Sequence, residues 1–389
     1  MRSTVVPSEI PNIASIPHLG GKRVFLSLGI DVPCRGDEVL DDFRLRAVIP
    51  TILFLQDRGA RVLIFGKRGS KKDESLQPIC LYLQKLFPVT FVGSVDGEDT
   101  KRTVANMKEG DIVLFENIRQ YDEESKNDPE FAKKLAAFAD VYVNECFPVS
   151  HREEASIVGV PQFLPSYAGL RFMEEVHSLS KAFAPQHPFL FMIGGAKFET
   201  KLPLLTRFFP LADQVFVGGA LQNDFFRAYG LEIGNSVVSE KEFDMRAILH
   251  HPKLLLPIDV EVEHEDKTTS IVKPEEVLKG DKIVDAGPAT TEMLKKYIDD
   301  AKYIIWNGPL GYYEDGFEKQ TKVLAELVAH ASADAAIGGG DTLAAIAALG
   351  LENKNEKLFL STGGGAMLDF LSNGTLPGIE ALLGRYHYG

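Results

Sequence analysis

The sequence has few of the features that mark secreted, membrane-bound or metal-cluster proteins. Its 389 residues include only three cysteines, Cys34, Cys80 and Cys146. They are far apart and odd in number, so they predict neither a disulfide framework nor a zinc site. No apolar run is long enough to cross a bilayer. Residues 1–17 contain three prolines and lack the apolar segment of a signal peptide. We therefore expect a cytoplasmic protein with no membrane partner.

Basic charge is scarce as well. The chain carries 42 Lys and Arg against 55 Asp and Glu, a formal net charge of −13. Nucleic acids require a broad basic surface, so we expect no nucleic-acid partner. The sequence also shows no Ser-His-Asp arrangement, no metal-binding histidine cluster and no obvious general base. Phosphoryl transfer to a carboxylate needs no base, because the nucleophile is already ionised and positioning with charge stabilisation suffices.

Short apolar runs alternate with amphipathic segments along the chain, in two sets. The runs cover residues 23–28, 61–65, 111–115 and 140–144, then 188–193, 214–217, 302–306 and 357–360. Helical patterns between them cover 42–58, 128–139, 200–209, 318–331 and 341–350. Continuous apolar strands separated by helices indicate parallel sheets that are covered on both faces. We predict an α/β protein with two doubly wound parallel-sheet (Rossmann-like) domains, since the chain is too long for one core.

The predicted domain boundary lies in the middle of the chain. Residues 168–183 have the pattern of one amphipathic helix, which Pro185 and Pro188 prevent from continuing. We divide the chain into an N-terminal domain over 1–167, a connecting helix over 168–183 and a C-terminal domain over 184–370.

Glycine-rich turns follow several strands of the second half. They are Gly194-Gly195-Ala196-Lys197, Gly218-Gly219-Ala220, Asn307-Gly308-Pro309-Leu310-Gly311, Gly338-Gly339-Gly340-Asp341-Thr342 and Ser361-Thr362-Gly363-Gly364-Gly365-Ala366. Glycine also serves plain strand-to-helix turns, but five such turns on one sheet edge favour polyphosphate binding at helix N-termini. Neither the P-loop nor the dinucleotide fingerprint is present, so we predict a phosphate site of different construction.

Charged residues accompany these turns. Asp341 is suited to a Mg²⁺ ion shared with phosphate oxygens and water, or to the N-cap of helix 341–350. Lys197 and Lys201 are four residues apart and share a helix face if that turn is helical. An anion between them would relieve their repulsion, whereas a solvated lysine face is the plain alternative.

Basic residues follow the strands of the first half. Arg44, Arg119, His151 and Arg152 suit carboxylate and phosphate groups, which guanidinium groups bind through paired hydrogen bonds. Taken singly, each of these residues is more simply interpreted as a surface or ion-paired side chain. Together they predict a pocket for a small acidic substrate.

The chain from about residue 21 to 383 resembles phosphoglycerate kinase. The segments that carry the resemblance, in order, are Leu114–Arg119, Asn127–Leu135, Gly194–Lys197, Trp306–Gly311, Gly338–Thr342 and Ser361–Ala366. The resemblance implies a monomer in which a hinge helix joins two domains and the tail 371–389 returns to the first. It implies reversible phosphoryl transfer between 1,3-bisphosphoglycerate and ADP, giving 3-phosphoglycerate and ATP in glycolysis.

The resemblance also implies site residues. Lys197 would meet the phosphates of Mg-ATP or Mg-ADP, Glu314 the ribose hydroxyls and Asp341 the metal. Arg44 and Lys201 would flank the transferred phosphoryl group, with the N–H groups of Gly364 and Gly365 stabilising its charge. The base pocket would comprise Gly218, Gly219, Asn307 and Pro309. The further nucleotide-binding residues would be Gly195, Ala196, Gly311, Gly339, Gly340 and Thr342. The acid-binding residues would be Asp31, Arg44, Lys67, Arg119, His151 and Arg152.

The first half departs from the family pattern. Gly29 replaces an acid, Asp31 an asparagine, Lys67 a histidine and Ser70 an arginine that grips the distal phosphate. The stretch Glu145-Cys-Phe-Pro-Val149 replaces Asp-Ala-Phe-Gly-Thr, and Thr200 replaces the Asp before the second lysine. A phosphoglycerate kinase with an altered triose pocket is our first hypothesis. A kinase for another small acid or acyl phosphate, and a nucleotide-binding homologue without catalysis, are the alternatives; a nicotinamide dehydrogenase is disfavoured.

Overall fold

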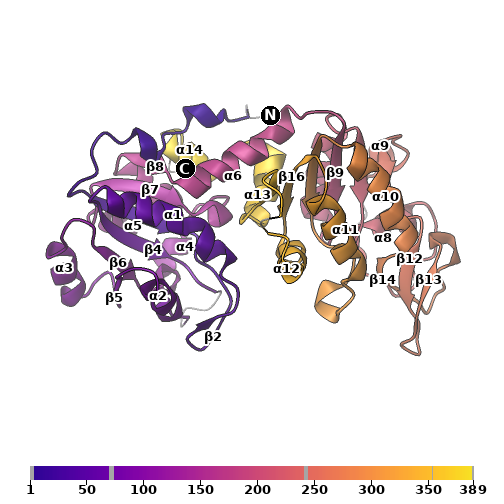
Figure 1. Cartoon of the computed structure of the whole chain (residues 1–389), viewed down its shortest axis with the longest axis horizontal. Helices are drawn as coiled ribbons and strands as arrows, with labels where there is room; N and C mark the ends of the chain where they lie inside the picture. The colour runs from indigo at the N-terminus through magenta and orange to yellow at the C-terminus, as the bar shows by residue number, and fades with distance from the viewer. Residues whose placement is uncertain (1–3, 70–73, 241–243, 353, 388–389) are drawn as a thin grey trace. The chain divides into compact units, whose positions relative to one another are not determined.

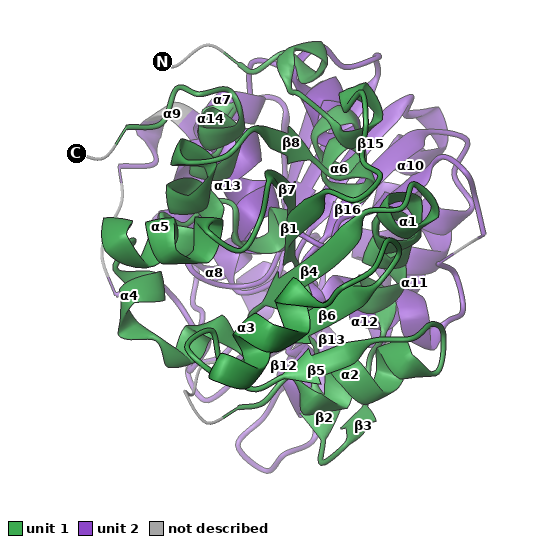
Figure 2. Ribbon diagram, turned by 90° about the vertical axis from the view of Figure 1, so that its left-hand side faces the viewer, with its two compact units in different colours: residues 1–177, 373–389 green, residues 178–372 purple. Residues whose placement is uncertain are grey.

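The chain folds into two compact units. The computed structural model describes residues 4–69, 74–240, 244–352 and 354–387. Unit 1 comprises residues 1–177 and 373–389, and unit 2 comprises residues 178–372 (Figure 2). The division falls within helix α6 (Leu170–Ser180), inside the segment for which the sequence predicts one helix. Each unit contains a parallel sheet, which confirms the predicted two-sheet α/β fold class.

Unit 1 is built on a six-stranded parallel sheet of order β5-β6-β4-β1-β7-β8, which can be followed in Figure 2; Figure 1 shows the same sheet from another side. From β1 the chain proceeds to β4 on one side and later to β7 on the other. The carboxyl end of β1 is therefore the switch point at which open α/β sheets bind ligands. The strands are β1 (Arg23–Leu28), β4 (Arg61–Gly66), β5 (Thr90–Val92), β6 (Ile112–Phe115), β7 (Val141–Glu145) and β8 (Ser166–Ala168).

Both faces of this sheet are buried, which explains the uninterrupted apolar runs. Leu26 and Ile64 belong to a cluster with residues of α1 (Phe43–Asp57) and α2 (Gln77–Gln84). The alternate residues Phe25, Phe65 and Phe115 form a stack with ring centroids 3.9 and 4.1 Å apart. Because successive side chains of a strand point to opposite faces, these two sets occupy the two sides of the sheet.

Shorter elements complete unit 1. Gly378 N donates to Ser150 O at 2.9 Å, so the C-terminal segment packs within this unit. The shorter elements of unit 1 are the hairpin β2 (Cys34–Arg35) and β3 (Glu38–Val39), α3 (Glu98–Ala105), α4 (Asp122–Ser125), α5 (Pro129–Ala136) and α14 (Pro377–Leu382).

Unit 2 has a second parallel sheet, of order β11-β10-β9-β15-β16-β17. The chain moves from β9 to β10 on one side and later to β15 on the other, so the switch point lies between β9 and β15. The strands are β9 (Phe189–Ile193), β10 (Gln214–Val217), β11 (Leu254–Leu255), β15 (Tyr303–Asn307), β16 (Asp334–Gly338) and β17 (Leu358–Leu360). The helices are α7 (Phe198–Phe208), α8 (Leu221–Ala228), α9 (Arg246–Leu249), α10 (Pro288–Asp300), α11 (Lys319–Ala329), α12 (Gly340–Ala348) and α13 (Gly365–Asn373).

A small antiparallel sheet, which the sequence analysis did not predict, is added to unit 2. It comprises β12 (Val260–Glu263), β13 (Thr269–Val272) and β14 (Lys282–Ala286) in the order β13-β12-β14. Val260 and Val262 pack in a separate apolar cluster that includes Phe226 and Ile283.

This sheet also corrects the expectation of no Ser-His-Asp arrangement. His264 Nδ1 lies 2.7 Å from Asp281 Oδ1, and its Nε2 lies 2.7 Å from Ser270 Oγ. Turns bring the three residues together, so spacing along the chain gives no sign of them. Asp281 also accepts a hydrogen bond from Leu278 N at 2.9 Å. We interpret these three hydrogen-bonded residues as stabilising the sheet, because their hydrogen bonds join the end of β12, strand β13 and the turn before β14.

Within the part of the chain that the structure describes, none of the helices combines the length and the apolar composition that crossing a membrane requires.

Candidate active site

The glycine-rich turns of unit 2 pack against one another at the carboxyl ends of β9, β10 and β15. Gly194 N donates to Asn307 O at 2.8 Å, and Gly195 N to Pro309 O at 2.9 Å. A Cβ on Gly194 would lie 2.3 Å from Pro309 O, and one on Gly219 would lie 2.3 Å from Gly195 N. Glycine is therefore required at both positions for the turns to pack, whether or not a ligand is bound.

Other glycines of this edge face open space. A Cβ on Gly340 or Gly364 would meet no atom within 4 Å. Helices α12 and α13 begin beside them, directly after β16 and β17, and α7 begins after β9. These strands lie on one side of the sheet in the order β9-β15-β16-β17, so three helix N-termini share one edge. Free N–H groups and the helix dipole make such an edge suited to phosphate.

Lys201 is a buried amine beside the β9 turn. Its side chain is 7% exposed, and its Nζ donates a hydrogen bond to Gly194 O. Burial, and then the charge of Lys197, lower the pKa of Lys201 to about 8. Lys197 is exposed and occupies the N-cap of α7 with φ 67°. The turn is therefore not helical at Lys197, and the condition under which the two lysines would share a helix face is not met. A bound anion would offset the repulsion and the loss of solvent that lower this pKa.

Asp341 and Glu314 bring two carboxylates near each other. Burial, and then the charge of Glu314, raise the pKa of Asp341. Helix α12 begins at Gly340 with Gly339 as its N-cap, so the alternative role of Asp341 as an N-cap is wrong. Among the described residues the buried Thr342 Oγ1 has no hydrogen-bond partner. Two repelling carboxylates and an unsatisfied hydroxyl fit a divalent cation with phosphate oxygens.

Protein side chains alone do not form a metal cluster at this edge. Within the described ranges, no three His, Cys, Asp or Glu side chains come together in a way that could hold a metal. A cation at Asp341 would thus take most of its ligands from phosphate and water, as Mg²⁺ commonly does.

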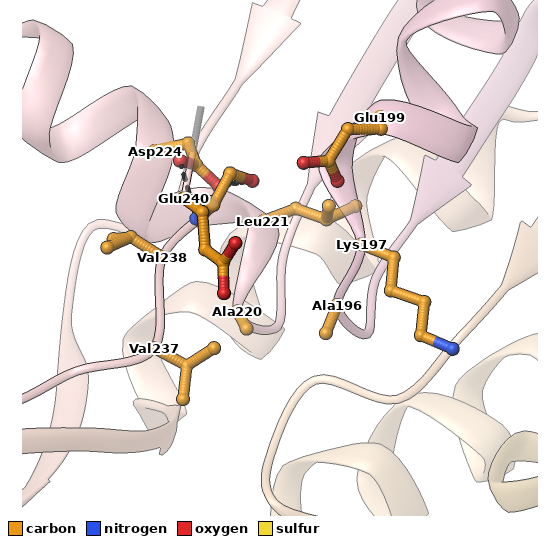
Figure 3. A pocket seen from close by; sticks show the side chains of 10 residues that line it. Ala196, Lys197, Glu199, Ala220, Leu221, Asp224, Val237, Val238 and Glu240 are labelled. Carbon is orange, nitrogen blue, oxygen red and sulfur yellow. Dashed lines mark hydrogen bonds between the residues drawn. The ribbon is translucent and has the colours of Figure 1, made fainter. Parts of the chain in front are cut away.

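A pocket of about 260 Å³ adjoins Lys197 (Figure 3). Its walls come from the turns after β9 and β10, from the first turns of α7 and α8, and from the segment 237–240. Asp224 on α8 accepts hydrogen bonds from Ser239 N and Oγ, both at 3.1 Å, and so holds that segment in place. The lining residues are Ala196, Lys197, Glu199, Ala220, Leu221, Asp224, Val237, Val238, Ser239 and Glu240.

The lining differs from the predicted base pocket. Gly218, Gly219, Asn307 and Pro309 do not line it, because they are engaged in packing among the strand-end turns. A Cβ on Gly311 would lie 2.4 Å from Phe317 O, which assigns that glycine to packing as well. Residues 237–240 line the pocket but were not among the predicted site residues, because they carry no recognisable motif.

A second cluster of predicted residues meets in unit 1. Asp31, Arg44, Lys67 and Arg119 line one small cleft at the carboxyl end of β1. Arg44 Nη1 donates to Asp31 O at 2.8 Å, and Arg119 Nη1 lies 3.6 Å from Asp31 Oδ2. These contacts orient both guanidinium groups at the switch point of the sheet.

His151 and Arg152 do not line this cleft, although Pro148 and Val149 from the same stretch do. Arg152 is half-exposed, and its Nη1 lies 3.7 Å from Glu154 Oε1. Ser70, the predicted replacement for a phosphate-binding arginine, lies outside the described residues.

Lys67 differs most from its predicted role. Its side chain is 3% exposed, and its Nζ donates to Glu124 Oε1 at 3.0 Å and to Glu154 Oε2. Burial opposes its charge, but the two carboxylates outweigh that effect and raise the pKa of Lys67 to about 12. The ammonium group is thus already balanced by two carboxylates, which argues against direct binding of a substrate phosphate.

Two other departures from the family pattern also have structural roles. A Cβ on Gly29 would lie 3.2 Å from Pro148 Cδ, so the proline ring fills the space beside this glycine. Glu145 is buried and accepts hydrogen bonds from Arg171 N at 2.8 Å and Phe172 N at 2.9 Å. It therefore caps the first turn of α6.

Two doubly wound parallel sheets, with glycine-rich turns and a buried lysine at one strand edge, define a class of α/β proteins suited to binding phosphate groups. The family model described as phosphoglycerate kinase matches residues 13–374. The chain belongs to the phosphoglycerate kinase family, whose members are phosphotransferases with a carboxyl group as acceptor.

Individual relatives match over almost their whole length. The phosphoglycerate kinase of Dictyoglomus turgidum is 41% identical over 382 residues, 94% of this chain and 96% of the relative. The phosphoglycerate kinase of Thermosipho africanus is 38% identical, again over 94% of this chain and 96% of the relative. The solved phosphoglycerate kinase of Coxiella burnetii matches with a TM-score of 0.82 at 32% identity, over 97% of this chain and 99% of the other. The solved phosphoglycerate kinase of Pyrococcus horikoshii matches with a TM-score of 0.84 at 26% identity, over 96% of this chain and 98% of the other.

Proposed function

We propose that this enzyme transfers a phosphoryl group reversibly between 1,3-bisphosphoglycerate and ADP, giving 3-phosphoglycerate and ATP. The observation that carries the proposal is the edge of unit 2, where three helix N-termini accompany a buried lysine. Among the described residues, the only polar partner of Lys201 is a backbone carbonyl. A buried cation without a carboxylate partner is costly, and a polyphosphate would compensate it.

The proposed nucleotide site extends along this edge. Lys197 and Ala196 would meet the phosphates, and the adjoining pocket would take the nucleoside. The turn Gly339-Gly340 would bring N–H groups to the phosphates, and Gly364 and Gly365 would do so for the transferred group. Lys201 would stabilise the charge on that group's oxygens. We retain Gly195, Gly218, Gly219, Asn307, Pro309 and Gly311 as the packing framework that holds these residues.

Asp341 would hold Mg²⁺, with Thr342 and Glu314 beside it. When bound, Mg²⁺ neutralises the charge of phosphate oxygens. In unit 1, Arg44, Arg119 and Asp31 would orient the acid substrate, Arg152 would add positive charge and His151 would offer a hydrogen-bonding group. We also propose that the enzyme is a cytoplasmic monomer, as its family resemblance implies.

Replacing Asp341 by alanine should weaken the binding of Mg-ADP by about tenfold or more while metal-free ADP binds nearly as before. Loss of the carboxylate removes a metal ligand and also removes a negative charge near the phosphates. Calorimetric titration with ADP, with and without Mg²⁺, measures both affinities. Glu326→Ala, which removes a carboxylate on α11, is the control. An unchanged ratio of the two affinities would reject the metal assignment.

A coupled assay with ATP, Mg²⁺ and 3-phosphoglycerate tests the function itself. We expect saturable turnover. Gly29 and the charge-balanced Lys67 give a specific reason to include other small acids in the same assay, because both alter the cleft of unit 1. Faster turnover with another carboxylic acid would favour the second candidate, a kinase for that acid. Mg-ADP binding without turnover of any acid would favour a binding role.

A further inference from the structure

Lys67 is the centre of a buried ion cluster at the carboxyl end of β4. Glu124 from α4 and Glu154 from the segment after β7 approach its ammonium group, and both carboxylates are nearly fully buried. Three elements of unit 1 therefore meet at one charge. Removing that charge would leave two buried carboxylates without their main partner.

The two carboxylates have different second partners. Glu124 accepts hydrogen bonds from Ser156 Oγ at 2.6 Å and from Ser156 N at 3.0 Å. Both carboxylate oxygens of Glu124 are thus held by hydrogen bonds within the protein. Glu154 instead faces arginines: Arg152 Nη1 lies 3.7 Å from its Oε1. Burial opposes ionisation of Glu154, yet Lys67, and then Arg119 and Arg152, lower its pKa. Glu154 is therefore an internal anion that can compete with a substrate for the two arginines.

We propose that Lys67 is a positioning residue that keeps Glu154 from pairing more closely with Arg119 and Arg152, so that these guanidinium groups stay available to the anionic acid substrate. This inference rests on the proposed function and deepens it. Lys67 acts through Glu154 and does not contact the substrate. Without Lys67, Glu154 keeps only the arginines as cationic partners, pairs with them more closely and competes with the substrate.

The inference predicts an unusual pattern in a double-mutant cycle. Lys67→Met should raise the KM for 3-phosphoglycerate about tenfold, the effect of losing one charge-assisted hydrogen bond. The KM for ATP should stay unchanged, because the nucleotide is proposed to bind unit 2. The double variant Lys67→Met/Glu154→Gln should return the KM for the acid to within about twofold of wild type. Lys101→Met, at an exposed lysine paired with Glu98, is the matched control and should change neither KM.

Each outcome distinguishes the inference from its rivals. If Lys67 contacted the substrate directly, the double variant would keep the raised KM, which would overturn the proposal. A purely structural role would lower the apparent kcat in step with the loss of folded protein seen by circular dichroism, and would leave both KM values unchanged. If Lys67→Met does not fold, Glu154→Gln alone carries the test. It should leave the KM for the acid equal to or below that of wild type, and a raised KM would count against the inference.

The failure of the proposed function has a separate signature. If the wild-type enzyme does not turn over 3-phosphoglycerate, the function is rejected whatever the variants do. Inorganic phosphate then serves as the probe of the same arginines, by calorimetric titration of the wild type, Lys67→Met, Glu154→Gln and the double variant. Weaker phosphate binding in Lys67→Met that is restored in the double variant would still support the positioning role, and equal binding in all four proteins would reject it.

Discussion

Replacing Lys201 by methionine is expected to lower kcat by about 10²- to 10³-fold, the usual effect of removing one donor that stabilises a developing anion. Affinity for ADP should change much less. The buried ammonium is partly destabilised in the free enzyme, since burial lowers its pKa to about 8, so its interaction with bound phosphate is offset by that desolvation. Its full effect is expected where charge accumulates on the transferred group. Steady-state kinetics and ADP titration measure the two quantities.

Lys197→Met is the matched control, because Lys197 is exposed and four residues away. It should weaken nucleotide binding more than it lowers kcat. Equal losses of kcat and affinity in Lys201→Met would reject the assigned role.

Binding ADP at pH 8 should also take up about half a proton in the wild type, because the bound phosphate raises the pKa of Lys201, which lies near 8 in the free enzyme. Calorimetry in buffers of different ionisation enthalpy detects this uptake, which Lys201→Met should abolish.

The main elements of the fold were predictable because both faces of each sheet are buried. All eight predicted apolar runs coincide with strands, from β1 to β17. The missed strands have weaker signals. β16 is rich in alanine, and β8 has only three residues. The antiparallel β12 alternates Val and Glu with one buried face, a period-two pattern that the search for continuous runs does not detect.

The candidate site was predictable where chemistry resides in backbone turns, and less so where side chains are partnered. The strand-end glycines mark the edge of unit 2, but the sequence could not separate those that pack, such as Gly194, from those that stay open, such as Gly340. Lys67 was predicted to be an acid-binding residue. Its buried partners Glu124 and Glu154 lie 57 and 87 residues away along the chain, so the prediction could not take them into account. Ion pairs of such separation leave no local pattern.

Glu145→Ala is expected to destabilise unit 1 by about 3 kcal/mol or more. The carboxylate accepts hydrogen bonds from Thr51 Oγ1, Arg171 N and Phe172 N, and Thr51 Oγ1 in turn accepts one from Leu170 N. Alanine would leave two buried N–H groups at the start of α6 unsatisfied, each at about 1–3 kcal/mol, and would open a cavity. Urea-induced unfolding followed by circular dichroism measures the change. Glu174→Ala, at an exposed carboxylate of the same helix, should have little effect.

The same carboxylate should make stability depend on pH. Burial raises the pKa of Glu145 to about 7, and its hydrogen bonds offset only part of that effect. A folded-state pKa above the unfolded value of about 4.3 means that the folded chain binds the proton more tightly. The resulting stabilisation is fully present below pH 4.3 and is lost as pH rises through 7, a change of about 4 kcal/mol. Asp285, whose pKa burial also raises to about 7, adds a change of the same sign.

Glu145→Gln in an Asp285→Asn background should therefore reduce the dependence of the free energy of unfolding on pH between pH 5 and 7. An undiminished slope in that double variant would show that neither carboxyl group takes up a proton in the folded enzyme, and that the donors around Glu145 keep it ionised despite its burial.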